Sequence, residues 1–268
     1  MDLNSESDLP EMIHLAADER DILMREEFGV YLKGLLKAGE RPEKKFVIFG
    51  RGRSGSTLLV RLLNSHPDIH CDGELLHDKV AFPMLYVQSK AVYSEKPVYG
   101  FKLLSYQLVS VQDMRKPTHF LKDLHERGYR VIYLRRENLL YHALSNIGAR
   151  RRGRFHQRVG DRYLEQEKMH VDVKEVLKWM RGSDHLRKLE EEILKETPHL
   201  SLTYESHLSV HENHQTTFDK ICRFLNLKTS SVSADLVKLM PRKLEEIVEN
   251  CEELCDSLRN TEYGWYIR

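Results

Sequence analysis

The stretch that decides the fold begins at Phe46 and reads FVIFGRGRSGSTLLVRLL to Leu63. Its first residues, 46–49, are apolar without alternation, which is typical of a strand buried on both faces of a parallel sheet. A glycine-rich loop follows at residues 50–57, and the leucines after it have the spacing of one face of a helix. Amides at the start of such a helix can hold phosphate oxygens. The stretch therefore predicts a phosphate-binding loop between a strand and a helix.

This loop departs from the P-loop pattern at one position. The spacing from Gly50 to Gly55 fits the pattern, but Ser56 stands where the lysine is expected, and Arg53 places a positive charge inside the loop instead. A nucleoside triphosphatase also needs a metal ion that bridges its phosphates. Here the apolar run that ends at Leu134 is followed by arginines and not by a metal-binding aspartate. The pattern favours a nucleotide whose phosphates are held by the protein without a metal.

The alternation of strand and helix continues along the chain. Apolar runs and helical spacing predict strands at residues 98–103, 129–134 and 200–204, and helices at residues 12–37, 117–127, 138–150, 173–196, 214–226 and 241–258. Strands that alternate with helices imply an α/β fold with a central parallel sheet covered on both faces. We therefore predict a P-loop-like three-layer sandwich, in which a parallel sheet is flanked by helices.

The chain of 268 residues shows no internal repeat and no linker. The simplest organisation is one α/β domain over residues 41–268, with residues 1–40 as a helical extension packed on it. The 42 basic and 41 acidic residues nearly balance, which gives no support to nucleic-acid binding by a basic surface.

Features of cellular location are few. The chain contains no apolar run of about 18 residues, so we expect no membrane span. Its acid-rich start does not resemble a signal peptide, and its four cysteines form no CxxC pair. These features predict a cytoplasmic protein without a metal site.

Two motifs resemble those of PAPS-dependent sulfotransferases. The sequence RSGST at residues 53–57 is similar to the 5′-phosphosulfate loop of that family, in the form found in carbohydrate and bacterial members. The sequence YLRRENLL at residues 133–140, continuing to Ser145, resembles the second signature, in which a strand-end arginine and a helix serine bind the 3′-phosphate. The similarity is greatest to the bacterial nodulation-factor-like and glycolipid-type branch and runs from about residue 45 to the end.

The resemblance implies PAPS as the sulfuryl donor, PAP as the product, and no metal. Either Arg135 or Arg136 could hold the 3′-phosphate. We favour Arg136, although its spacing to Ser145 is one residue longer than is usual in the family. The expected nucleotide-binding residues are Arg51, Gly52, Arg53, Ser54, Gly55, Ser56, Thr57, Arg136 and Ser145. Of these, Arg51 could contact either phosphate or only solvent.

Sulfuryl transfer needs a base for the acceptor hydroxyl and cations for the charge that develops on the leaving phosphate. Glu74 is expected in the loop just past a short strand at residues 69–71. It is the expected base, because a glutamate in this segment deprotonates the acceptor in the carbohydrate enzymes that the chain resembles. Asp72 and His77 are alternatives, and the base is a histidine in the phenol-type enzymes. Arg53 and Lys102 are the expected catalytic cations, although a lysine at the end of a strand can also simply face solvent.

A cluster of arginines from Arg150 to Arg158 has two possible roles. It could bind the 3′-phosphate or an anionic acceptor through charge-assisted hydrogen bonds. It could equally be the basic end of a helix, placed favourably against the helix dipole.

The sequence thus predicts a sulfotransferase that moves a sulfuryl group from PAPS to a hydroxyl of a carbohydrate, a glycolipid or a small metabolite. Two alternatives stay open. The first is a small-molecule kinase with a degenerate P-loop, which would need ATP and magnesium. The second is a protein that binds the nucleotide without catalysing any transfer.

Overall fold

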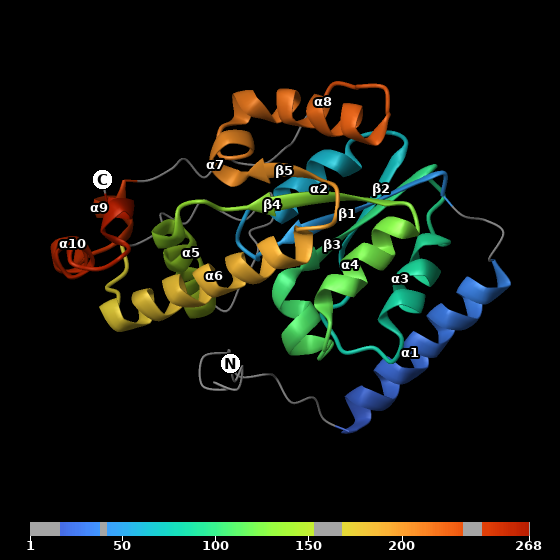
Figure 1. Ribbon diagram of the computed structural model, residues 1–268, viewed down its shortest axis with the longest axis horizontal. Helices are drawn as coiled ribbons and strands as arrows, with labels where there is room; N and C mark the ends of the chain where they lie inside the picture. The colour runs from blue at the N-terminus through green and yellow to red at the C-terminus, as the bar shows by residue number, and fades with distance from the viewer. Residues whose placement is uncertain (1–16, 38–41, 153–167, 233–242, 268) are drawn as a thin grey trace.

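A five-stranded sheet forms the centre of the protein (Figure 1). The computed structural model describes residues 17–37, 42–152, 168–232 and 243–267. The strands pair in the order β2-β3-β1-β4-β5, and every pair is parallel. They are β1 (Lys44–Gly50), β2 (Ile69–Glu74), β3 (Val98–Leu104), β4 (Tyr129–Arg135) and β5 (His199–Thr203). The predicted parallel sheet flanked by helices is confirmed.

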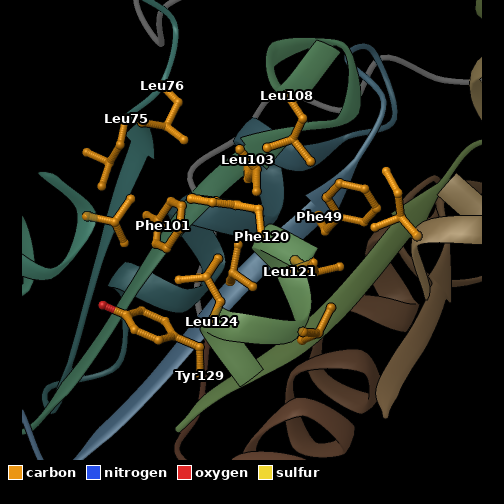
Figure 2. Packing of buried hydrophobic residues seen from close by; sticks show 14 of the residues in the cluster. Phe49, Leu75, Leu76, Phe101, Leu103, Leu108, Phe120, Leu121, Leu124 and Tyr129 are labelled. Carbon is orange, nitrogen blue, oxygen red and sulfur yellow. The ribbon is translucent and has the colours of Figure 1, made fainter. Parts of the chain in front are cut away.

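Three helices cover one face of the sheet. They are α3 (Pro83–Ala91), α4 (Pro117–Glu126) and α6 (Val173–Leu194). Figure 2 shows Phe49 of β1, Phe101 of β3 and Tyr129 of β4 on this face, packed with the α4 leucines. Alternate residues of a strand point to opposite faces, so each strand contributes every second side chain to this layer. Of these helices, α3 was not predicted from the sequence.

The opposite face is covered by α2 (Ser56–Asn64) and α8 (His214–Leu225). Phe46 and Ile48 of β1 pack there with leucines of α2. Because apolar side chains leave both sides of β1, this strand reads as a continuous apolar run in the sequence. The two covered faces make the three-layer arrangement that we predicted.

A third apolar cluster lies beyond the carboxyl ends of the strands, where α5 (Leu139–Arg152) packs against α6 and α10 (Cys251–Arg259). The prediction of one helix over residues 241–258 is wrong in the part that the structure describes. Here α9 (Leu244–Ile247) and α10 are separate helices, because the intervening Val248 forms a parallel bridge with Met169. Residues 241–242 lie outside the described part. The remaining short elements are η2 (Gln107–Val111), α7 (Tyr204–His207), η3 (His211–Asn213) and η4 (Gly264–Ile267).

The helix α1 (Ala17–Leu36) lies alongside α3 at the outside of the protein (Figure 1). Glu27 accepts a hydrogen bond of 2.7 Å from the Ala81 amide, and the Tyr31 hydroxyl accepts one of 3.1 Å from the Phe82 amide. The first residues of the predicted helix, 12–16, lie outside the described part. Within the described residues, no helix has the length and apolar character that a membrane span requires.

The strand order determines where a ligand can bind. From β1 the chain continues to β2 on one side of the sheet, whereas from β4 it continues to β5 on the other side. In open α/β sheets a crevice forms at such a switch point, outside the carboxyl ends of the strands. The loop after β1 and the segment after β4 therefore meet at the position where ligands of this fold class bind.

Candidate active site

The loop from β1 to α2 passes close to its neighbours at two glycines. Gly50 has φ 151°, and a Cβ added there would lie 2.0 Å from the Leu134 carbonyl oxygen of β4. Gly55 has φ 85°, and its Cβ would lie 2.8 Å from the Tyr204 ring. Only glycine adopts these backbone angles easily and also leaves out the Cβ for which there is no room. The two glycines therefore allow the loop to pack closely against β4 and α7.

Two helices begin at this edge of the sheet, and their first turns differ. Helix α2 begins with Ser56 and Thr57 after Gly55, which has no side chain to cap the helix, and its first turn contains no acidic residue. Ahead of α5, by contrast, the Glu205 carboxylate accepts hydrogen bonds of 3.0 Å from the Glu137 and Asn138 amides. A helix N-terminus attracts anions. A carboxylate thus lies just ahead of α5, whereas the first turn of α2 carries none of its own.

Arg53 and Arg136 meet beside the loop, together with Ser145 of α5. The Arg53 Nε donates to the Ser145 Oγ at 3.1 Å, and an Arg136 Nη donates to the Arg53 carbonyl at 3.4 Å. Arg136 also lies 4.8 Å from the centre of the Tyr204 ring and 3.9 Å from Glu205. Burial lowers the pKa of Arg136, although nearby Tyr204 and Glu205 oppose the shift. The structure thus brings these predicted nucleotide-binding residues into one cluster.

Arg135 lies apart from this cluster. Its guanidinium is 3.3 Å from Glu137 and about a third of its side chain is exposed, at 34%. The side chain of Arg136, by contrast, is only 15% exposed. Of the two arginines considered for the 3′-phosphate, Arg136 is the one next to the loop.

Arg51 occupies a position that the sequence did not indicate. We expected it to contact phosphate or solvent, but its guanidinium is buried beneath the loop, with 1% of the side chain exposed. It donates to the Ser183 carbonyl at 2.9 Å and to the Arg136 carbonyl at 3.1 Å, and its Nε lies 3.3 Å from Glu190. Glu190 also accepts hydrogen bonds from Ser105 and Tyr133. Arg51 therefore supports the loop from below.

The buried acid beneath the loop was missed in the sequence. Burial raises the pKa of Glu190, and the nearby Arg51, Ser105 and Tyr133 oppose the rise. Within its run of charged residues on α6, Glu190 looks like part of a solvated face. The side chain is instead fully buried, at 0% exposed. A buried carboxylate needs such partners, because an unpaired buried charge is costly.

Polar atoms of the loop and of Arg136 are buried without a hydrogen-bond partner among the described residues. They are the Arg51 Nε, which has its ion pair with Glu190, the Ser54 hydroxyl and the Arg136 Nε. Buried polar atoms are normally hydrogen-bonded, so each exception needs a reason. A bound anion with several acceptor oxygens would suit donors in this position.

Glu74 and Lys102 form an ion pair at the carboxyl ends of β2 and β3. The Lys102 Nζ lies 2.7 Å from one Glu74 oxygen, and the Gln107 side-chain amide donates to the other at 2.8 Å. Gln107 is fixed in turn, because its own oxygen accepts from the Leu104 amide at 2.9 Å. Glu74 is the last residue of β2, beyond a bulge at Asp72 and Glu74, and not in the loop after the strand. Lys102 is buried, so it does not face solvent.

The two alternative bases have other partners. Asp72 accepts a hydrogen bond from the Tyr99 hydroxyl at 2.8 Å and lies 3.1 Å from His70. His77 contacts the Glu74 carbonyl at 2.7 Å and Asp78 at 2.9 Å, and 61% of its side chain is exposed. Neither makes a hydrogen bond or an ion pair with Lys102 that the structure records. Of the candidates considered, Glu74 is the one paired with the predicted catalytic lysine.

The arginine cluster at the end of α5 is only partly described. Arg151 donates to the His170 carbonyl at 2.6 Å and lies 3.8 Å from Glu175, while Arg150 is exposed. Arg154 and Arg158 lie outside the described residues. The contacts of Arg151 hold the end of α5 against the segment that leads into α6.

Comparison with known proteins adds one family. Residues 45–144 match the sulfotransferase family. The matched segment runs from β1 to α5 and includes the loop, Glu74, Lys102 and Arg136. The match is to the family as a whole and not to one of its branches. No curated protein matches the chain. Over residues 45–144 the chain is thus similar to the sulfotransferase family, whose enzymes are PAPS-dependent transferases.

Proposed function

We propose that this protein transfers the sulfuryl group of PAPS to a hydroxyl group of its acceptor. The observation that carries the proposal is that two groups of side chains lie at the same edge of the sheet, at the carboxyl ends of its strands. One is the cationic cluster of Arg53, Arg136 and Ser145, and the other is the Glu74–Lys102 pair. The first suits a nucleotide with two phosphate sites, and the second suits a hydroxyl acceptor.

The nucleotide would bind along the loop. Its phosphosulfate would accept hydrogen bonds from the amides of residues 52–57, at the N-terminus of α2, where Gly55 provides no capping side chain. Its 3′-phosphate would lie against Arg136 and Ser145. Arg53, which already contacts Ser145, links the two sites. The cations and amides would hold both phosphates without a metal ion.

The chemistry is an in-line displacement at sulfur. The acceptor oxygen forms a bond to sulfur while the bond from sulfur to the 5′-phosphate oxygen breaks, and the acceptor proton passes to the Glu74 carboxylate. Negative charge develops on the departing phosphate oxygen. Arg53, the loop amides and Lys102 would stabilise that charge. When Glu74 takes the proton, it no longer neutralises Lys102, so the lysine charge becomes available to the leaving group.

The acceptor that we propose is a carbohydrate, a glycolipid or a small hydroxylated metabolite. This follows from the resemblance of the loop to carbohydrate-type enzymes and from a glutamate, rather than a histidine, next to Lys102. We also propose a cytoplasmic location, because all four cysteines are free thiols. The division into a domain at residues 41–268 and an N-terminal extension stays a prediction.

Thermal unfolding with nucleotides tests the proposal directly. PAP in the presence of a chelator should raise the melting temperature, because a ligand that binds only the folded state stabilises it by about 2.7 kcal/mol at 100 times its Kd. Radiolabelled PAPS, screened against sugars and hydroxylated lipids, then identifies the acceptor. Stabilisation by ATP with magnesium but not by PAP would indicate the kinase alternative. PAP binding with no transfer to any acceptor would indicate a silent nucleotide-binding protein.

A further inference from the structure

His142 lies in the interior between the phosphate loop and α6. Its Nε2 is 2.7 Å from the carbonyl oxygen of Gly52, within the loop, and its Nδ1 is 2.8 Å from the Ser183 hydroxyl of α6. The residue belongs to α5 and is 4% exposed. None of the roles discussed so far uses this histidine.

The partners of the ring determine which nitrogen carries the hydrogen. A carbonyl oxygen can only accept, so Nε2 must be the donor to Gly52. A neutral ring then leaves Nδ1 as an acceptor for the Ser183 hydroxyl. Burial lowers the pKa of His142 to about 3, and the positive charge of Arg51 contributes, so the ring is neutral at physiological pH. The histidine is therefore a fixed donor to the loop.

A fixed carbonyl also fixes the amide that follows it. The protein has no cis peptide bond among its described residues, and in a trans peptide the C=O and the next N–H point in opposite directions. Because His142 holds the Gly52 oxygen toward the interior, the Arg53 N–H points away from the interior. Arg136 does the same one residue later, since it binds the Arg53 carbonyl and so directs the Ser54 N–H.

The support beneath this peptide comes from α6. Ser183 binds His142 through its hydroxyl and Arg51 through its carbonyl oxygen, at 2.9 Å. His142 and Arg51 thus share Ser183 as a hydrogen-bond partner. Any shift of the Gly52 peptide would break a hydrogen bond that the buried ring cannot replace with water.

We propose that His142 is a positioning residue for the nucleotide: by holding the Gly52 carbonyl, it directs the Arg53 amide toward the 5′-phosphosulfate. The inference rests on the proposed function, and it deepens that function by naming how the loop is prepared for its anion. The loop would have its binding conformation before the nucleotide arrives, which lowers the cost of ordering on binding.

A pair of substitutions separates this role from a general contribution to folding. His142→Gln places an amide donor near the position of Nε2 and can keep the bond to Gly52. His142→Asn reaches only the position of Nδ1 and cannot. The readout is the ratio of the Kd of adenosine 3′-monophosphate to the Kd of PAP, which measures the contribution of the 5′-phosphate alone. We expect His142→Asn to lower this ratio at least about tenfold, the lower end for a charged hydrogen bond, and His142→Gln to restore most of it.

His66 supplies a matched control. It is equally buried, at 4% exposed, and it contacts the Lys228 carbonyl at 3.0 Å through Nε2 and the Asp68 amide through Nδ1. It lies just beyond the last residue of α2, at the opposite end of that helix from the loop. His66→Asn should lower the melting temperature without changing the ratio of the two Kd values.

The possible outcomes separate a failure of the proposed function from a failure of the inference about His142. A wild-type protein that does not bind PAP overturns both the proposed function and this inference. A wild-type protein that binds PAP, with an unchanged ratio in His142→Asn, overturns the inference alone, and so does an equal loss in His66→Asn. If His142→Asn does not fold, Ser183→Ala takes its place, because it removes the partner that orients the ring. The ratio must then fall in Ser183→Ala, and an unchanged ratio rejects the inference.

Discussion

The two sides of the candidate site are held in different ways. On the loop side, main-chain carbonyls are bound by side chains that are mostly shielded from solvent, such as His142 on Gly52 and Arg136 on Arg53. On the acceptor side, the Glu74 side chain is held by two other side chains, Lys102 and Gln107, and remains 24% exposed. A peptide held from the interior has little freedom, whereas a side chain held by an ion pair can exchange its partner during a reaction.

This difference leads to a general expectation. Changes on the loop side should alter the affinity for the nucleotide, because the loop presents a prepared set of donors. Changes on the acceptor side should alter the rate, because a proton and a charge move there during the reaction. The following predictions test this division, from the largest expected effect to the smallest.

Glu74→Gln should reduce turnover by about 10²–10⁴-fold while the PAP affinity stays nearly unchanged. Glutamine keeps the size of the side chain but cannot accept the acceptor proton. The measurement is steady-state transfer from radiolabelled PAPS together with PAP binding by calorimetry. Asp72→Asn and His77→Gln serve as controls and should be milder. Near-normal turnover in Glu74→Gln with loss in His77→Gln would assign the base to the histidine.

Arg136→Ala should weaken PAP binding by about 1.5–3 kcal/mol, which corresponds to a loss of roughly 10–100-fold. The same change should affect adenosine 5′-monophosphate less, only through the lost contact with the Arg53 carbonyl, because that ligand lacks the 3′-phosphate. Arg135→Ala is the matched control, since Arg135 is the neighbouring arginine outside the cluster. An equal loss for both ligands would place Arg136 in a supporting role for the loop.

Acidification should weaken the loop side through His142. Its pKa is about 3 in the folded protein against an ordinary value of 6.5, so the unfolded chain binds the proton more tightly. The contribution of the neutral ring is therefore complete above about pH 6.5 and is lost as the pH falls toward 3. Within that window the free energy of unfolding should fall by up to about 1.4 kcal/mol per pH unit. Urea unfolding of wild type and His142→Gln between about pH 7 and 4.5 measures this difference, and parallel curves would contradict it.

Most of the fold could be predicted because its signals are local. The apolar run of β1 and the glycines of the loop predicted the strand, the turn and the helix in their observed order. The helix α3 was missed. The tail was wrongly predicted as one helix, because Val248 makes a bridge to a distant residue that the local sequence does not indicate. Local patterns do not report contacts of that kind.

The candidate site was predictable only for the residues that we propose to contact the ligand. Arg53 and Arg136 stand in motifs, Glu74 stands in a segment that resembles carbohydrate-type enzymes, and the structure places all three at the carboxyl edge of the sheet. The supporting residues carry weaker signals. His142 is three residues before Ser145, so the two share a face of α5, and this spacing could have identified it. For Glu190, which lies in a charged run, the sequence offers no signal that separates a buried acid from an exposed one.

The contact between Arg51 and α6 has a consequence for the order in which the protein folds. Arg51 and its partner Ser183 are 132 residues apart in the chain, and Ser183 and Glu190 both lie beyond the matched segment 45–144. A growing polypeptide thus contains the whole loop long before the helix that neutralises Arg51 has been synthesised. Loss of one partner of a buried charge pair typically costs about 3–5 kcal/mol, a large part of the stability of a domain. We therefore expect the loop to reach its folded conformation late during translation, after α6 has left the ribosome. We also expect that the segment 45–144 does not fold when it is expressed alone.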